Sequence, residues 1–347
     1  MPRSIHFGVF LLGTGNHTAG WRYPGADQTF LDIKVLQRVA AIAERGLFDF
    51  LFLGDGLAAN LRNHPSYTCR LEPMTLLSAL AMTTTHIGLA ATMSTTYSDP
   101  YTVARVFASL DHISGGRAAC NAVTTSASNA GGNFGRTHPN HELRYEIAEE
   151  FISVVLGLWD CWSDKAIIAD LKTGKFFDES EVRPLNHQGP HFSVKGPLNT
   201  GRCPQGRPLV LQAGGSERGL NLAARTADVV FSVVQDFGEA RLAYSDLKER
   251  VRRFGRDPDS VTILPASCRS SARLTLRHGT CSTCCKATST QRRDWRCCRR
   301  DWAPTCRNTL STGRFRMSRS PTRHMGSPGQ CYPRGSARTC RSATSTT

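Results

Sequence analysis

The 347-residue sequence has no apolar run near the roughly 18 residues that a membrane-spanning helix needs. Its first 266 residues contain no G-x-S-x-G nucleophile motif and no histidine, cysteine or acidic cluster at metal-ligand spacing. Only four of the 13 cysteines lie there, each alone, which excludes a disulfide scaffold. The N-terminal segment lacks a convincing cleavage site. These absences favour a cytoplasmic protein with no bound metal ion and no membrane association.

Charge is distributed unevenly along the chain. Residues 1–266 contain 26 basic and 26 acidic side chains, whereas residues 267–347 contain 17 basic and only 2 acidic ones. The net charge of +15 therefore lies in the last 81 residues, which also hold nine cysteines. We expect a folded domain over residues 1–266 and a disordered tail over 267–347, rich in Arg, Cys, Ser and Thr.

The first 266 residues alternate apolar strand segments with amphipathic helix segments, which is typical of a parallel sheet covered by helices. Seven predicted strands, with helices between them, indicate an α/β fold: a TIM-type (β/α)8 barrel whose eighth unit is missing. A doubly wound open sheet is the alternative, but residues 13–20 lack the glycine spacing of a dinucleotide fingerprint. Residues 126–140 and 165–206 are predicted insertions, the second with a small hairpin. The predicted strands are 5–12, 48–55, 87–96, 117–125, 208–214, 228–234 and 261–266.

Polar residues gather where several of these strands end, which is where a barrel carries its chemistry. Asp55 ends the second strand, Thr92 and Asn121 lie late in the third and fourth, and Ser216 opens a helix after two glycines. A carboxylate, an amide, hydroxyls and free backbone N–H groups suit a polar ring and a phosphate. Each residue also has a structural interpretation: Asp55 and Ser216 can cap, and Thr92 and Asn121 can satisfy backbone groups at the rim.

His141 and Tyr145 lie one turn apart on the same face of a predicted helix. They can contribute to the site or simply pack against each other. Residue types and spacing alone leave the site a hypothesis, and they identify no catalytic residue.

Several collinear segments of residues 5–265 together resemble a known family. They include HFGVFLLGTGNHTAGWR, FDFLFLGDG, LEPMTLLSAL, IGLAATMSTTYSDPYTVAR, ASLDHISGGRAACNAVTT, HELRYEIAEEF and PQGRPLVLQAGGSERG. This part of the chain resembles the large component of two-component flavin-dependent monooxygenases of the luciferase-like superfamily. The branch is the one that contains nitrilotriacetate monooxygenase component A and dibenzothiophene-sulfone monooxygenase.

The resemblance implies a barrel that binds reduced FMN from a separate NAD(P)H:flavin reductase and uses O2 to oxidise a small organic substrate. Aminocarboxylates and organosulfur compounds are substrates in the family. It also implies a homodimer if the barrel is intact, and no nucleic-acid partner. At position 215 the family usually has serine, and here a glycine still supplies its backbone N–H. The positions that match flavin contacts of the family are Asp55, Thr92, Asn121, His141, Tyr145 and Ser216.

After Ala266 the sequence departs from the family. Residues 268–319, re-read in a shifted frame with allowed codons, give an amphipathic pattern that resembles the family's next segment. A frame shift near residue 266 is therefore predicted. Zinc binding through Cys281 and Cys284, or nucleic-acid binding through the basic excess, are the alternatives for the tail.

The shift affects the expected function. A barrel that lacks its last strand exposes two unpaired edges, so we expect poor solubility and impaired activity. The alternative to an impaired oxygenase is an inactive barrel remnant that binds at most flavin.

Overall fold

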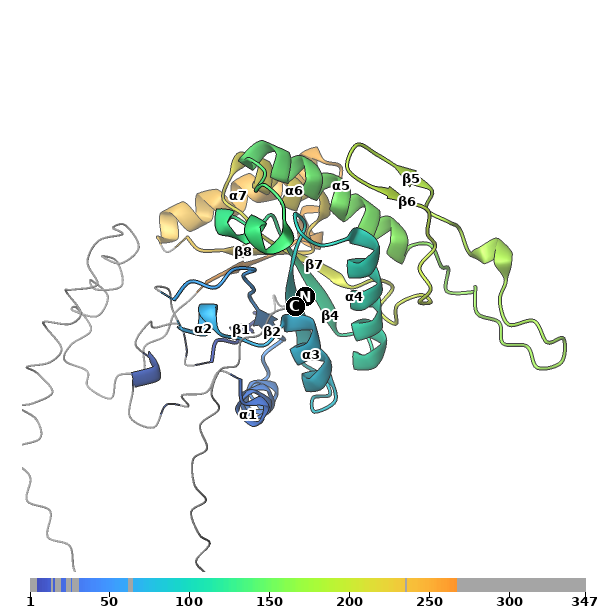
Figure 1. Cartoon of the computed structure of the whole chain (residues 1–347), viewed down its shortest axis with the longest axis horizontal. Helices are drawn as coiled ribbons and strands as arrows, with labels where there is room; N and C mark the ends of the chain where they lie inside the picture. Colours follow the sequence, from blue (N-terminus) through green and yellow to red (C-terminus); the bar gives the residue numbers. More distant parts are fainter. Residues whose placement is uncertain are drawn as a thin grey trace, which may run out of the picture. The chain divides into compact units, whose positions relative to one another are not determined.

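Seven parallel strands form one sheet, as the alternation of apolar segments predicts (Figure 1). The computed structural model describes residues 5–13, 15, 20–22, 26, 31–61, 65–234 and 236–266, and the predictions for residues 267–347 lie outside this part. Each strand of the sheet neighbours the next one in chain order, apart from a separate hairpin of β5 and β6. The seven strands are β1 (Gly8–Phe10), β2 (Phe50–Leu53), β3 (Gly88–Ser94), β4 (Ala118–Val123), β7 (Leu209–Ala213), β8 (Val229–Ser232) and β9 (Thr262–Pro265).

Helices surround the strands, and side-chain caps fix where most of the long ones begin (Figure 1). Asp99, for example, accepts a hydrogen bond from the backbone N–H of Thr102 at 2.8 Å, and Pro100 is the first residue of the helix that follows. Gly115 follows the last residue of that helix, and its φ of 68° suits glycine. The long helices are α1 (Ile33–Arg45), α3 (Pro73–Ala81), α4 (Pro100–Ser114), α5 (His141–Trp159), α6 (Glu217–Thr226) and α7 (Phe237–Arg253). The short ones are η1 (Gly20–Arg22), α2 (Pro65–Thr68), η2 (Ser128–Phe134), η3 (Glu179–Glu181) and η4 (Pro258–Ser260).

One face of β2 is buried and the other is half-buried, and both pack against apolar side chains, which explains why β2 reads FLFL without a polar residue. Leu51 and Leu53 pack outward in the large core beneath the helices, whereas Phe50 and Phe52 pack in a second core with Ala90. The Phe52 ring stacks on Phe231 of β8, with ring centroids 5.9 Å apart. Because β2 and β8 are the second and sixth strands in the sheet, this contact requires the sheet to curl around an apolar interior, as in a barrel.

The sheet is not closed within the described residues. Strand β1 pairs only with β2 there, and β9 pairs only with β8. The described residues thus supply seven parallel strands of the predicted (β/α)8 architecture, and among them no eighth strand joins β9 to β1.

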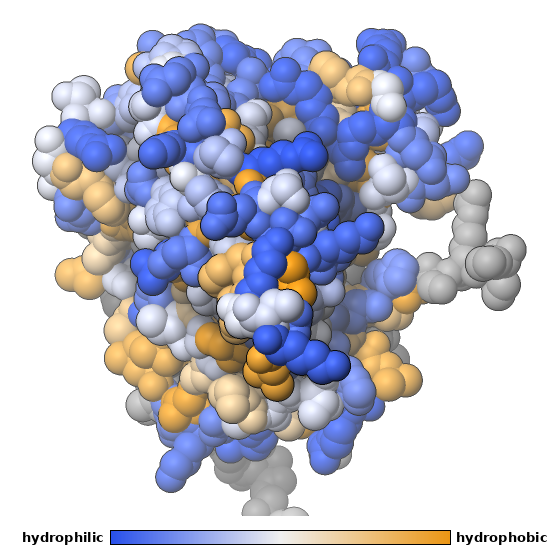
Figure 2. Space-filling model, turned by 90° about the vertical axis from the view of Figure 1, so that its right-hand side faces the viewer, coloured by the Kyte–Doolittle hydropathy of each residue, from blue (hydrophilic) through white to orange (hydrophobic). Residues whose placement is uncertain are grey.

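The second predicted insertion, between α5 and β7, carries the expected hairpin of β5 (His187–Gln188) and β6 (Ser193–Val194). Glu150 of α5 anchors it, because its carboxylate accepts the backbone N–H groups of His191 and Phe192 at 3.0 and 2.9 Å. The side of the molecule that carries β5 and β6 has a largely hydrophilic surface with scattered apolar side chains (Figures 1 and 2). This insertion therefore packs on α5, outside the curled sheet.

Candidate functional site

Two of the predicted polar residues meet inside the curled sheet. Thr92 of β3 lies directly opposite Asn121 of β4 in the strand register. Both are buried, and the amide nitrogen Nδ2 of Asn121 donates to the hydroxyl oxygen of Thr92 at 2.8 Å. Among the described residues, the hydrogen bond that these two side chains make is to each other and not to a backbone group at the rim. The Thr92 hydroxyl can still donate its proton, and the Asn121 amide oxygen can still accept a hydrogen bond.

The loops after β3 and β4 are tied together just beyond this pair. The hydroxyl oxygen of Ser94 accepts the backbone N–H of Tyr97 at 3.1 Å and the hydroxyl of Thr125 at 2.7 Å. The Tyr97 hydroxyl lies 2.7 Å from Nδ1 of His138, and its ring stacks on Phe134 with centroids 4.7 Å apart. The insertion at 126–140 is thereby held against the carboxyl ends of the strands.

A second pair of predicted residues meets at the start of α6. Ser216 caps this helix by accepting the backbone N–H of Gly219 at 3.1 Å, and it donates its own proton to the Tyr145 hydroxyl oxygen at 3.0 Å. Tyr145 also contacts His141, with ring centroids 4.9 Å apart. The capping interpretation of Ser216 and the packing interpretation of His141 and Tyr145 are thus both confirmed. The same contacts place three polar groups beside the N-terminus of α6.

The backbone around Ser216 is built for close approach. A Cβ atom on Gly219 would lie 2.8 Å from the Tyr145 hydroxyl oxygen, so only glycine leaves room for that hydroxyl. At Gly215 a Cβ would meet nothing within 4 Å, so the space on that side of the backbone is open. The first N–H groups of a helix have no partner within the helix, and the helix dipole attracts anions there. The start of α6 therefore offers hydroxyls and backbone donors to an anion.

Charges flank this helix start. Arg218 bonds to the Glu142 carboxylate at 2.8 Å, and this bond contributes most to lowering the pKa of Glu142. Nδ1 of His141 lies 2.8 Å from the same carboxylate. Glu142 thus pairs with Arg218, so the Arg218 guanidinium is already bonded to a carboxylate beside the start of α6.

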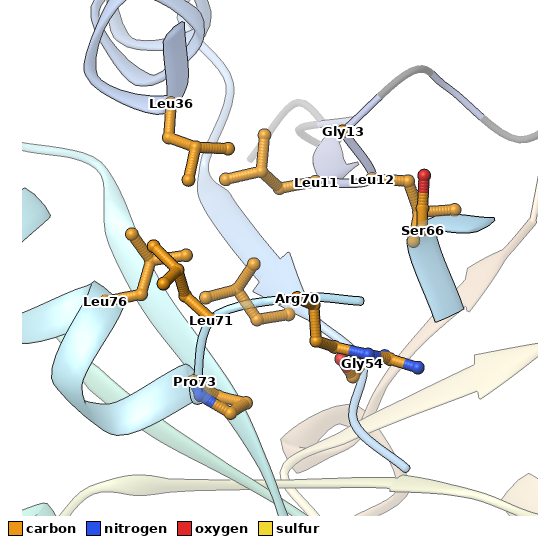
Figure 3. Close-up of a pocket in the computed structure, with 11 residues that line it drawn as sticks. Leu11, Leu12, Gly13, Leu36, Gly54, Ser66, Arg70, Leu71, Pro73 and Leu76 are labelled. Carbon is orange, nitrogen blue, oxygen red and sulfur yellow. Dashed lines mark hydrogen bonds between the residues drawn. The ribbon is translucent and has the colours of Figure 1, made fainter. Parts of the chain in front are cut away.

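Asp55 lies elsewhere at the strand ends, beside Arg70, whose side chain borders a small cavity next to Gly54 (Figure 3). Its carboxylate oxygen is 3.9 Å from Nε of Arg70, and it also accepts the backbone N–H of Gly56. Burial raises the pKa of Asp55, and the positive charge of Arg70 only partly opposes this effect. Asp55 is therefore a half-buried carboxylate with a loose ion pair.

The described contacts thus divide the predicted site residues into three groups. Thr92 bonds to Asn121, Tyr145 joins His141 to Ser216, and Asp55 pairs with Arg70. Sequence reasoning missed Arg70 and the Tyr97–His138 bond, because no motif marks contacts between separate loops. The one available signal for Arg70 was a lone cation directly before the apolar segment LEPMTLL.

Two further classes of site are absent from the part of the chain that the structure describes. It contains no group of three or more His, Cys, Asp or Glu side chains that could hold a metal ion. Of its helices, none has both the length and the apolar character needed to cross a bilayer.

The family model of the luciferase-like monooxygenases matches residues 5–273. The chain therefore belongs to the luciferase-like monooxygenase family. It is 49% identical over 265 residues to an N-acetyl-S-(2-succino)cysteine monooxygenase of Bacillus subtilis (strain 168), which covers 76% of this chain and 60% of the relative. It is 44% identical over 277 residues to nitrilotriacetate monooxygenase component A of Aminobacter aminovorans, with 76% and 61% covered. The predicted resemblance to this branch is confirmed.

Solved structures agree with the fold. A crystal structure of riboflavin lyase with modified FMN and riboflavin superposes with a TM-score of 0.70 at 32% sequence identity. The match covers 76% of this chain and 62% of that chain. The chain thus spans about 60% of the length of the curated relatives it matches, and residues 274–347 lie outside the family match.

Proposed function

We propose that this chain is the oxygenase component of a two-component monooxygenase, which uses reduced FMN and O2 to oxidise a small organic substrate. The observation that carries the proposal is the hydroxyl pair of Ser216 and Tyr145 at the N-terminus of α6, in a chain of the luciferase-like family. The phosphate of FMN needs anion-binding groups, which the start of α6 offers. The flavin ring needs hydrogen-bonding side chains, which β3 and β4 offer in Thr92 and Asn121.

The residues fit FMN by their chemistry. The Ser216 and Tyr145 hydroxyls and the backbone N–H groups beside Gly215 suit the phosphate, whose charge the helix dipole favours. The buried pair of Thr92 and Asn121 supplies a donor and an acceptor for the polar edge of a flavin ring. His141 packs on Tyr145 and holds its ring in place.

Within this proposal the protein positions the cofactor and keeps water away. Bound reduced FMN supplies the electrons that activate O2. The side chains at the strand ends bind and orient, and the insertion at 126–140, tied down by the Tyr97 and His138 contact, shields the site from solvent. No acid–base pair among the predicted site residues is needed for this role.

We further propose that a separate NAD(P)H:flavin reductase supplies the reduced FMN in a transient encounter, and that complete barrels of this kind associate as homodimers. Residues 1–266 form the barrel domain in this account, and residues 267–347 are a separate tail. Because the described sheet leaves β1 and β9 unpaired with each other, we expect the chain as written to turn over poorly.

Turnover separates the oxygenase from a remnant that only binds flavin. The chain is incubated with FMN, NADH and a flavin reductase, and substrate-dependent O2 uptake is measured over a panel of aminocarboxylates and organosulfur compounds. The matched control is the same gene with its reading frame shifted back after codon 266. We expect the restored chain to oxidise at least one compound and the chain as written to be slower. If the restored chain oxidises none of them, the proposed activity is wrong.

A further inference from the structure

Arg144 of α5 holds the turn that follows β4. Its Nη1 donates to the backbone carbonyl oxygen of Thr125 at 2.6 Å and also to that of Thr124, at 3.4 Å. Its Nε is buried and has no hydrogen-bond partner among the described residues. A buried N–H group without a partner is costly, and more so on a charged side chain. The placement of Arg144 therefore favours the two carbonyl contacts over full satisfaction of its own donors.

The turn that Arg144 holds has a strained backbone. Thr125 has a φ of 47°, which lies in the left-handed region. The described non-glycine residues with positive φ are Leu47, Thr125, Ala169 and Asn186, and Thr125 is the one β-branched residue among them. A β-branched residue rarely adopts this conformation, so the contacts around it must impose it. Backbone strain of this kind is concentrated at functional sites.

The turn brings the Thr125 hydroxyl to the face of the sheet that carries the proposed flavin-ring residues. This hydroxyl donates to Oγ of Ser94 at 2.7 Å. Ser94 lies two residues after Thr92 in β3, so both side chains lie on the same face of the strand. Thr92 in turn accepts from Asn121 of β4. Two hydrogen-bonded pairs, one above the other, thus bridge β3 and the end of β4.

Arg144 also acts on the neighbouring insertion at 126–140, through its charge. Desolvation lowers the pKa of His138, and the positive charge of Arg144 lowers it further. A neutral imidazole can accept the proton of the Tyr97 hydroxyl, which lies 2.7 Å from Nδ1. One arginine therefore supports both the turn after β4 and the contact that ties the insertion to the loop after β3.

From these contacts we propose that Arg144 is a positioning residue for the flavin ring. By holding the turn after β4, it fixes the Ser94–Thr125 pair beside the residues proposed to contact the ring. The inference rests on the proposed function, because it concerns the ring end of that same site. Arg144 acts through the turn and is not itself a ligand of the flavin. A guanidinium suits this task, because its N–H donors have fixed directions and it stays charged.

The test compares reduced FMN with reduced riboflavin, because a change at the ring end affects both flavins equally. Anaerobic titrations of the purified full chain measure the dissociation constant of each flavin, and urea unfolding without flavin measures stability. The variants are Arg144→Gln, Thr125→Asn and the double variant, with Arg105→Gln on the exposed side of α4 as the matched control. Asparagine adopts a positive φ far more readily than threonine, and its amide can still donate to Ser94.

We expect Arg144→Gln to weaken the binding of both flavins about tenfold, while the ratio of their dissociation constants changes less than about twofold. The same variant should lower the urea midpoint by about 0.5–1 M. In the Thr125→Asn background both losses should shrink, the binding loss to about threefold or less, because asparagine adopts this backbone with less support. Arg105→Gln should bind both flavins like the unaltered chain.

The inference is wrong if Arg144→Gln binds both flavins normally, or if it loses FMN alone, which would place Arg144 at the phosphate. It is also wrong if the losses in Arg144→Gln are as large with asparagine as with threonine at position 125. Arg144 would then stabilise the chain without acting through the turn. If the unaltered chain binds neither reduced flavin, the proposed function fails. In that case equal midpoint losses in the two backgrounds would show separately that Arg144 does not hold the turn.

Discussion

Replacement of Ser216 by alanine tests the contact that links the helix start to Tyr145. The change removes the side chain that caps α6 at the Gly219 N–H and that donates to the Tyr145 hydroxyl oxygen. Loss of a serine N-cap costs about 1 kcal/mol, and loss of a neutral hydrogen bond costs about 0.5–1.5 kcal/mol. We therefore expect Ser216→Ala to lower the free energy of unfolding by about 1.5–2.5 kcal/mol.

A double-mutant cycle with Tyr145→Phe separates the two contributions. Tyr145→Phe removes only the hydroxyl and leaves the ring that packs on His141. The two changes should be non-additive, with a coupling free energy of about 0.5–1.5 kcal/mol in urea unfolding. The control is Ser109→Ala on α4. The Ser109 hydroxyl donates to the backbone carbonyl oxygen of Arg105 in its own helix, and its loss should change the free energy of unfolding by less than about 0.5 kcal/mol. Full additivity of Ser216→Ala and Tyr145→Phe would show that the hydroxyls do not interact.

Three further predictions concern other parts of the chain. Burial raises the pKa of Glu44, but bonds from the backbone N–H groups of residues 85–87 outweigh it and lower the pKa overall. The stability that these bonds give should be lost as pH falls through the folded-state pKa of Glu44. Glu44→Gln should lower the free energy of unfolding by about 1–3 kcal/mol at pH 7, and urea unfolding of this variant should depend less on pH. Asn121→Ala leaves the buried Thr92 hydroxyl without its partner and should cost about 1–3 kcal/mol in the same assay, with weaker binding of reduced FMN; unchanged values would argue against the pair. Resequencing the gene across codons 255–347 should reveal a single-base insertion or deletion, and an unchanged reading would refute the frame shift.

Most of the fold was predictable because both faces of the strands pack largely against apolar side chains. Uninterrupted apolar segments such as FLFL, each followed by a capped amphipathic helix, specify a parallel sheet without any information about distant contacts. The strand ends were less predictable: the first strand was expected over residues 5–12 and runs from Gly8 to Phe10. The stacking of Phe52 on Phe231 could not be predicted, because it depends on how far the sheet curls.

The candidate site was predictable in its residues and not in its contacts. Thr92 and Asn121 could be placed near each other because neighbouring parallel strands end at the same edge. That they bond to each other depends on the register, which the sequence pattern leaves open. Arg70 was missed because it reaches Asp55 from a separate loop, where no periodicity applies.

The central claim is that the start of α6 binds the phosphate of FMN. An anaerobic titration of the full chain with reduced FMN and with reduced riboflavin tests it directly, because the two ligands differ only in the phosphate. We predict saturable binding of one FMN per chain, with riboflavin at least about tenfold weaker in the unaltered chain, since a charged hydrogen bond contributes 1.5 kcal/mol or more. The preference should become smaller in Ser216→Ala, which removes one of the proposed phosphate donors and leaves the Tyr145 hydroxyl and the backbone N–H groups. Equal binding of the two flavins, or no saturable binding of either, would contradict the account.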